Sequence, residues 1–495
     1  EIFIMFIKKN LTLIYYLYLA SLIFLPLDFF VFSEQNNYGI TLSVSKVLQI
    51  STYFLIMINI LIFRDFSFIE KILLSLKKHK YFFYFIGIAL LATTIGFINR
   101  NYNAPIENEF NKLFFLEKRY LLSLIRPLYE IGIEFHKYFY FILLAPIILD
   151  TKEKIHKLFK VLFIVIIINL FISFCDYGLT FLDLEIIPRH LIDWRHVGYR
   201  LHGLFGEPRD AYIGLIFSIC FISIYKQYIN KKMSYFWIPL FIGALFFTNA
   251  TSGALGSIVF IFIMGIQTFV PASFASNSKV RIFIFINIVV VILFFLFSLR
   301  FQFYFFQILQ FILNILESKK VFDNIDGLKI YILDIENYLK TLWEIDIRYH
   351  VKVGEIIPSG RSRSGWGLTA QSEDFIALLA IMERFLTLDI WNIFIGSGSG
   401  SISFYNNKIL GVVNVVNSHS KFINILFNYG LIGIFSLIYS MQYVIKNSFS
   451  KCNIFEKQLQ LGVFYWLVCS NFIHDSYLIY LIVGLILSCN LIRRK

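Results

Sequence analysis

Residues 159–182 read FKVLFIVIIINLFISFCDYGLTFL, and no charged side chain lies between Lys160 and Asp176. About 20 apolar residues at roughly 1.5 Å each cross a hydrocarbon core of roughly 30 Å. In lipid such a segment must be a helix, because every backbone N–H and C=O group has to find its hydrogen bond within the segment. The stretch therefore predicts a membrane-spanning helix.

The composition places the whole chain in the same class. Of its 495 residues, 58% are hydrophobic and only 16% are charged, and a soluble domain could not cover that much apolar surface. We expect an all-α polytopic membrane protein with about twelve transmembrane helices. The expected spans are 11–33, 41–63, 81–98, 131–149, 159–182, 211–229, 236–250, 253–270, 282–299, 422–445, 458–473 and 476–492.

The lysines predict which ends of these spans face the cytoplasm. Cytoplasmic connections carry an excess of basic residues, and nearly all lysine-rich connections fall on one side once the spans alternate. We therefore expect both termini to be cytoplasmic. The lysines and arginines that define this side are Lys8, Lys9, Lys71, Lys77, Lys78, Lys80, Lys152, Lys154, Lys157, Lys160, Lys226, Lys231, Lys232, Lys279, Lys446, Lys451, Lys457, Arg493, Arg494 and Lys495.

Three connections on the opposite, outer side are long enough to form a site. Residues 1–299 are expected to hold nine spans, with outer loops at 99–130 and 183–210. A large, partly helical outer loop follows at 300–421, and residues 422–495 supply the last three spans. Functional residues concentrate on loops that a rigid scaffold positions, so we expect the site here rather than in the spans.

The net charge of +13 does not indicate nucleic-acid binding, because topology and anionic lipid headgroups explain the cytoplasmic lysines. Most arginines, in contrast, lie on the outer side. Arginine binds phosphate through a planar two-point fork, so this bias favours an outward-facing phosphate-bearing ligand, although arginines can also reach outer headgroups. They are Arg100, Arg119, Arg126, Arg189, Arg195, Arg200, Arg209, Arg300, Arg348, Arg361, Arg363 and Arg384.

The first outer motif is RLHGLFGEPRD, at residues 200–210. Its two glycines permit tight backbone conformations, and Pro208 can begin the following helix. The motif thus brings Arg200, Arg209 and Glu207 to the mouth of a helix. The alternative is a turn in which Glu207 pairs with an arginine.

Two further motifs lie toward the end of the large loop. The second motif has two segments: residues 358–364 read PSGRSRS, and residues 391–400 read WNIFIGSGSG. It is not a nucleotide phosphate loop. On its own, this pattern is typical of a flexible loop beside basic residues. Residues 417–433 read NSHSKFINILFNYGLIG and set His419 near the start of a span. Histidine can act as a base near neutral pH, or it can simply neighbour a helix cap.

The order of these motifs resembles the O-antigen ligase and O-antigen polymerase family, over roughly residues 197–445. Residues 249–254, NATSGA, are similar to the small-residue stretch that this family has between two spans. Two departures affect the substrate and subfamily more than the fold: Ser420 stands where the family usually has Asn, and Arg209 where it often has a small residue.

The resemblance implies inverting transfer of a polyprenyl-diphosphate-linked glycan to an acceptor hydroxyl, at the outer face of the bacterial inner membrane. In a polymerase the acceptor is another lipid-linked glycan, and in a ligase it is a lipid A core. The two substantial outer loops before and after the central spans favour the polymerase. Arg200 and Arg361 would stabilise the departing diphosphate, with Arg209 and Arg363 as helpers. His419 is the first candidate base and Glu207 the second. No cofactor is expected.

A metal-dependent mechanism remains an alternative, because other polytopic glycosyltransferases hold a divalent cation on acidic outer loops. The pairs Asp183 with Glu185 and Glu344 with Asp346 have suitable spacing, but such pairs arise often by chance. We therefore expect no metal.

A transporter or flippase of lipid-linked saccharide is the alternative from another class. Transport sites place charged groups near the middle of the bilayer. The expected spans carry few such groups apart from Asp28, Asp176 and Glu134, near span edges, which favours the enzyme.

Overall fold

A computed structural model provides the structure of the protein. It describes residues 2–25, 43–62, 64, 66–78, 80–99, 119–180, 184, 201, 203–205, 208–230, 232–233, 236–248, 381, 384–385, 388–402, 421–448, 464, 466–468 and 476–494. The expected spans 253–270 and 282–299 lie outside these residues, as does most of the expected loop 300–421.

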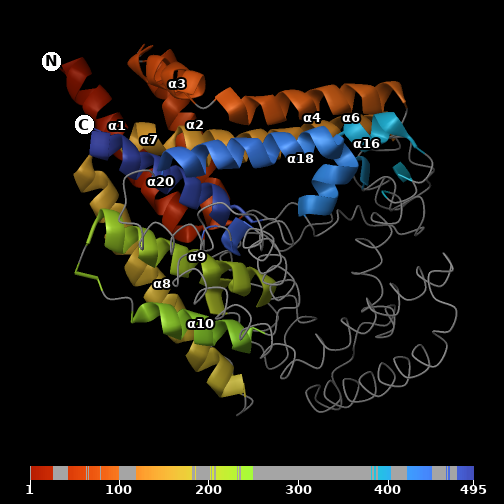
Figure 1. The fold of residues 1–495 in the computed structure, drawn as a ribbon. Coiled ribbons are helices and arrows are strands. Elements are labelled where there is room, and N and C mark those ends of the chain that lie inside the picture. Colours follow the sequence, from red (N-terminus) through yellow and green to blue (C-terminus); the bar gives the residue numbers. More distant parts are fainter. Residues whose placement is uncertain are drawn as a thin grey trace, which may run out of the picture.

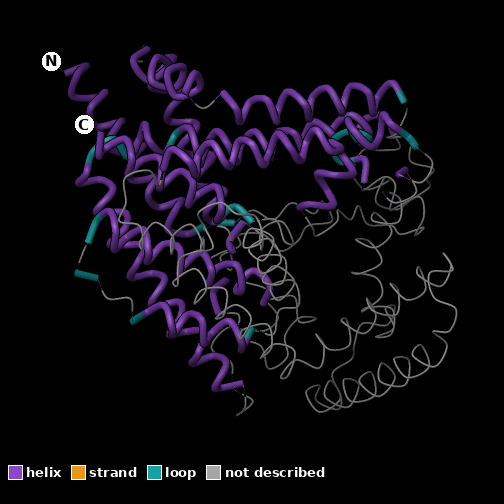
Figure 2. The backbone as a smooth tube through the Cα atoms, viewed as in Figure 1, coloured by secondary structure: helices purple, strands orange, loops and turns teal. Residues whose placement is uncertain are grey.

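The described residues form helices and connecting turns, and no β-strand occurs among them (Figure 2). The elements in chain order are α1 (Ile2–Phe24), α2 (Val44–Leu61), α3 (Phe66–Lys78), α4 (Lys80–Ile98), α6 (Arg119–His136), the π-helix η1 (Lys137–Leu143), α7 (Ala145–Ile148), α8 (Lys152–Thr180), the 3₁₀ turn η4 (Gly203–Phe205), α9 (Pro208–Tyr228), α10 (Trp237–Phe247), α16 (Ile390–Phe394), α18 (Lys421–Ser448) and α20 (Leu478–Arg494).

Four of the described helical segments are long and apolar enough to cross a membrane, which agrees with the expected class of membrane protein. Shorter apolar helices accompany them, and all match expected spans in position. The long segments are Val44–Leu61, Pro127–Ile148, Lys152–Leu179 and Lys421–Ser440; the shorter are Asn10–Phe24, Phe83–Ile98, Ala211–Lys226 and Leu478–Leu491. The total of about twelve spans stays a prediction.

Helix α3 occupies a region that the sequence analysis treated as a connection. Its apolar residues recur at helical spacing, so one side can pack while the other stays exposed. Phe68 is buried, and the hydroxyl of Ser75 donates to the carbonyl of Leu143 at 3.5 Å. Leu73 and Leu74 are exposed. This helix therefore lies against the end of the α6–η1–α7 segment and presents apolar side chains outward.

Helix α20 forms the centre of the packing. Nearly all its side chains from Leu478 to Leu487 are buried, and it contacts η1, α7, α8, α9 and α18. Around it, α1 lies beside α2, α4 beside α18, and α9 beside α10 (Figure 1). The first turn of α1 and the last turn of α20 lie at the same end of the molecule (Figure 1).

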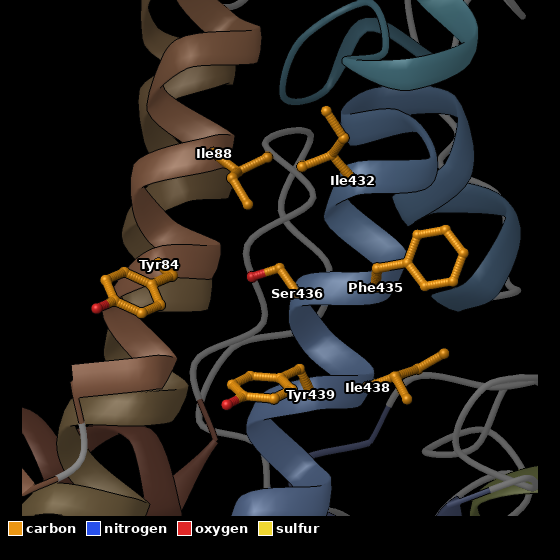
Figure 3. A pocket seen from close by; sticks show the side chains of 7 residues that line it. All are labelled: Tyr84, Ile88, Ile432, Phe435, Ser436, Ile438 and Tyr439. Atoms are coloured by element: carbon orange, nitrogen blue, oxygen red, sulfur yellow. The ribbon is translucent and has the colours of Figure 1, made fainter.

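An apolar groove of about 660 Å³ lies between α4 and α18 (Figure 3). Its lining residues are Tyr84, Ile88, Ile432, Phe435, Ser436, Ile438 and Tyr439. The Ser436 side chain is directed toward α4, and its Oγ is buried without a hydrogen-bond partner (Figure 3). The groove thus combines an apolar surface with one unsatisfied hydroxyl.

Candidate functional site

The structure describes only part of the predicted site. Arg200, Glu207, Arg361, Arg363 and His419 lie outside the described residues. Arg209 is placed by its backbone as the second residue of α9, Pro208–Tyr228. The structure does describe residues next to some of these positions in the chain: 201 and 203–205 in the first motif, 388–402, and α18 from Lys421 onward.

The motif at 200–210 is anchored to two helices. The N–H of Leu201 donates to the carbonyl of Phe247 in α10 at 2.7 Å, and the N–H of Leu204 donates to Asn169 Oδ1 in α8 at 2.9 Å. Gly203 has φ +56° and lies against Ser173 of α8, where a side chain would collide. Helix α9 begins at Pro208, as predicted.

The motif at 417–433 contains a break in a helix. Helix α18 runs from Lys421 to Ser448, but Gly430 has φ 63° and ψ −165°, far from helical values. The segments 421–429 and 431–448 are therefore two arms, which meet at an angle (Figure 1). The break leaves carbonyl groups of the first arm without intrahelical donors, and inside a membrane these must be satisfied by other protein groups.

The glycine-rich stretch at 396–400 supplies the missing donors. The N–H of Ser397 donates to the carbonyl of Phe427 at 3.1 Å, and the N–H of Gly398 to that of Asn428 at 2.8 Å. The N–H of Ser399 donates to Thr93 Oγ1 in α4 at 3.0 Å. The stretch suggested a flexible loop in the sequence, whereas here it is a packed clamp on the end of the first arm.

Arg384 completes this clamp. Its guanidinium donates to Ser397 Oγ at 2.6 Å and to the carbonyl of Phe427 at 3.2 Å. The same group lies 3.9 Å from the centre of the Phe427 ring, which adds a cation–π interaction. The outer arginines were expected to favour phosphate, but in the structure Arg384 binds the protein's own backbone.

At the other end of the first arm lies a buried cluster of charges. Glu134, Lys137 and Lys421 are only 6%, 3% and 5% exposed. Lys137 Nζ donates to Glu134 Oε1 at 3.0 Å, and Lys421 Nζ binds the same oxygen. The second oxygen, Oε2, is buried and has no hydrogen-bond partner. An oxygen held in this way can accept a hydrogen bond from a hydroxyl group.

Sequence reasoning missed the cluster. Glu134 was assigned to a span edge and Lys137 was overlooked, although Lys137 lies near the middle of the candidate span Pro127–Ile148. Lys137 is thus an ionisable group inside a candidate span that the expectation did not include. The available signal was the spacing of Glu134 and Lys137, three residues apart in an apolar segment, because ionisable residues inside membrane helices are rare and usually functional. No pattern could reveal the partnership with Lys421, 287 positions after Glu134.

Two features of the surroundings set the position of Lys137. The α-helix changes to the π-helix η1 at this residue, and π-turns inside helices occur frequently at functional sites. Its ammonium group also lies 5.2 Å from the ring centre of Tyr477, just before α20, and 5.7 Å from that of Tyr480, within α20. Aromatic faces attract a cation, so these two rings help to fix the Lys137 side chain.

The preceding residue, His136, belongs to a separate polar network with α2. Its Nε2 lies 2.8 Å from Gln49 Oε1 and its Nδ1 lies 2.9 Å from the Tyr53 hydroxyl. Gln49 Nε2 donates to Ser45 Oγ at 2.9 Å, which leaves the Gln49 oxygen as an acceptor. His136 therefore donates through Nε2, and a neutral ring accepts the Tyr53 proton at Nδ1.

The described residues contain no group of three or more side chains suited to a metal ion. The acidic pairs considered for a metal, Asp183 with Glu185 and Glu344 with Asp346, lie outside the described part of the chain.

Comparison of the chain with family models, with curated proteins and with solved structures finds no match.

Proposed function

We propose that the protein is a polytopic membrane glycosyltransferase of the O-antigen polymerase or ligase type. It transfers a glycan from a polyprenyl-diphosphate carrier to an acceptor hydroxyl at the outer face of a bacterial inner membrane. One observation carries the proposal furthest: the glycine-rich motif and the motif that follows His419, separate in the sequence, meet at the break in α18.

The roles of the residues follow from the charge that develops in this reaction. Departure of the lipid diphosphate leaves negative charge that fixed cations must stabilise, and Arg200 and Arg361 are assigned to it, with Arg209 and Arg363 as helpers. Attack by the acceptor hydroxyl releases a proton, which His419 accepts, or Glu207 if His419 does not. Direct attack opposite the leaving group inverts the anomeric centre.

The proposed topology completes this picture. About twelve spans, with both termini in the cytoplasm, place residues 183–210 and 300–421 at the outer face. The first turn of α1 and the last turn of α20 lie at the same end of the molecule, which supports termini on one side of the membrane (Figure 1). The acceptor is a second lipid-linked glycan in the polymerase form, which we favour, and a lipid A core in the ligase form.

Reconstitution in lipid with a polyprenyl-diphosphate oligosaccharide and an acceptor glycan tests the proposal. Wild type should form extended glycan, and Arg200→Ala, Arg361→Ala and His419→Ala should each lose product while unfolding at the wild-type temperature. Arg64→Ala and His156→Ala are matched controls, because both side chains are exposed in described parts of the chain away from the motifs. Full activity in the three site variants would refute the assignment.

A transporter or flippase of lipid-linked saccharide is the second candidate, and two observations favour it. Buried charges inside candidate spans and a helix that breaks in its membrane segment are both common features of transport sites. The same vesicles distinguish the two functions. Movement of labelled lipid-linked saccharide between leaflets, without a new glycosidic bond, would support the transporter and contradict the enzyme.

A further inference from the structure

The first arm of α18, residues 421–429, depends on contacts at both of its ends. The break at Gly430 separates this arm from the rest of the helix, so its position comes from its neighbours. At Phe427 and Asn428 the arm is fixed by the backbone donors of Ser397 and Gly398. At its start it is fixed by the ion pair between Lys421 and Glu134.

The ion pair is buried on both sides, which makes its geometry restrictive. The side chains of Lys421 and Glu134 are 6% and 8% exposed, so neither charge can exchange its partner for bulk water. Removing one partner of a buried pair leaves an uncompensated charge and is strongly destabilising. The first residue of α18 is thereby tied to one position on α6.

Glu134 itself has little freedom to follow a displaced arm. It lies one turn before Lys137, whose ammonium group binds the same oxygen and also faces the rings of Tyr477 and Tyr480. The carboxylate therefore links α6 directly with the start of α18, and Lys137 extends this link to the start of α20. A displacement of Lys421 would break its pairing with Glu134 rather than move the carboxylate with it.

We propose that Glu134 is a positioning residue for His419, acting through Lys421. Lys421 follows His419 by two residues, so the ion pair sets where the segment carrying the histidine enters α18. The inference rests on the proposed function for its kinetic consequence, and on the described ion pair alone for its structural consequence. It assigns to a side chain of the membrane segment a part in the reaction at the outer loops.

Glu134→Gln tests the kinetic consequence. The substitution keeps the shape of the side chain and removes its charge, so the histidine should lose its alignment while substrate-binding groups stay intact. A misplacement of about 1 Å can cost roughly a hundredfold in rate, and we expect kcat to fall about 10- to 100-fold, with KM for the lipid-linked donor nearly unchanged. Glu70→Gln, at an exposed side chain of α3, removes a carboxylate without removing this ion pair and should keep the wild-type kcat.

Hydrogen exchange tests the structural consequence without any enzymatic assay. The first four N–H groups of a helix lack intrahelical acceptors, so protection is best followed from Ile425 to Tyr429. Glu134→Gln should speed exchange there while leaving 431–448 protected. Unchanged exchange and unchanged kcat in this variant would overturn the proposal. If wild type makes no product but exchange still responds, the proposed function and the kinetic role fail, and only the structural role of the ion pair in fixing the first arm stands.

A double variant that exchanges the two charges distinguishes loss of the ion pair from simple misfolding. The double variant Glu134→Lys with Lys421→Glu keeps two lysines and one glutamate in the cluster, now with the carboxylate on α18. It should restore most of the lost kcat and the slow exchange of the arm. Failure of this rescue in a variant that unfolds at the wild-type temperature would also count against positioning through the ion pair.

Discussion

The backbones of Gly430 and Phe394 pack directly against each other. A Cβ atom at Gly430 would overlap the carbonyl group of Phe394, the last residue of α16, and Gly430 also has φ 63°. The break in α18 and its contact with α16 therefore both require a residue without a side chain.

Gly430→Ala should consequently destabilise the protein. A backbone with φ 63° and ψ −165° is essentially restricted to glycine and costs another residue about 1–3 kcal/mol, and the overlap with Phe394 adds to this. We expect a clear drop in the unfolding temperature of the detergent-solubilised protein. The matched control is Gly87→Ala in α4, where nothing lies within 4 Å of the new atom. It should be neutral or stabilising, because alanine favours a helix. Equal unfolding temperatures for the two variants would contradict the close contact.

Arg384→Lys should behave like a loss of the side chain rather than a conservative change. Lysine has no planar fork and cannot hold Ser397 Oγ and the Phe427 carbonyl together while facing the Phe427 ring. Each hydrogen bond to a charged group contributes about 1.5–3 kcal/mol, so we expect a loss of about 2 kcal/mol or more.

Limited proteolysis, followed at the bonds around residues 396–402, measures this effect. Faster cleavage in Arg384→Lys than in Arg64→Lys, an exposed arginine, is the expected result. Identical cleavage would mean that the glycine-rich clamp holds without Arg384.

The apolar helices were predictable because each needs only a local apolar run, and α8 covers most of the segment 159–182 that was predicted as a span. Pro208 was equally predictable as a helix start, since the fit of its ring to the first turn is a local property that does not depend on distant residues. Amphipathic spacing could also have revealed α3, which a search for continuous apolar runs passes over.

The partnerships between distant residues were not predictable. Ser399 donates to Thr93, 306 positions away, and Lys421 binds Glu134, and neither contact leaves a local pattern. The glycine-rich stretch looked flexible because its composition permits many conformations, and only the free carbonyls of the broken helix select one of them. Arg384 looked like a phosphate ligand because its guanidinium group can bind any suitable pair of oxygen acceptors, whether they belong to a phosphate or to the protein.

The hydrogen bonds of His136 should be energetically coupled to Tyr53. Tyr53→Phe removes the donor to Nδ1, and His136→Phe leaves the buried oxygen of Gln49 without its donor, at about 1–3 kcal/mol. Because the two changes share one bond, their effects on unfolding should not add, and the double variant should lose less than the sum. Strict additivity in this double-mutant cycle would show that the bond contributes nothing to stability.

Ser436→Ala should leave stability unchanged or raise it. The hydroxyl is buried in the groove between α4 and α18 without a partner, and removing an unsatisfied polar group relieves the cost of its burial, about 1–3 kcal/mol. Ser440→Ala, one turn later on the same helix, is the matched control, because Ser440 donates to the carbonyl of Leu437 at 2.8 Å. Thermal unfolding should rank Ser436→Ala above Ser440→Ala, and the reverse order would contradict the described geometry.

Product formation should survive removal of divalent cations. The proposed mechanism assigns the charge of the leaving diphosphate to Arg200 and Arg361, and guanidinium groups keep their charge in excess chelator. The rate should therefore match that of untreated protein, while a metal-dependent glycosyltransferase in the same buffer loses its activity. Loss of product in chelator, with recovery on adding Mg²⁺ or Mn²⁺, would contradict a mechanism in which arginines alone stabilise the leaving diphosphate. The acidic pairs Asp183 with Glu185 and Glu344 with Asp346 would then be the first positions to substitute, because carboxylate oxygens are the ligands that these cations prefer.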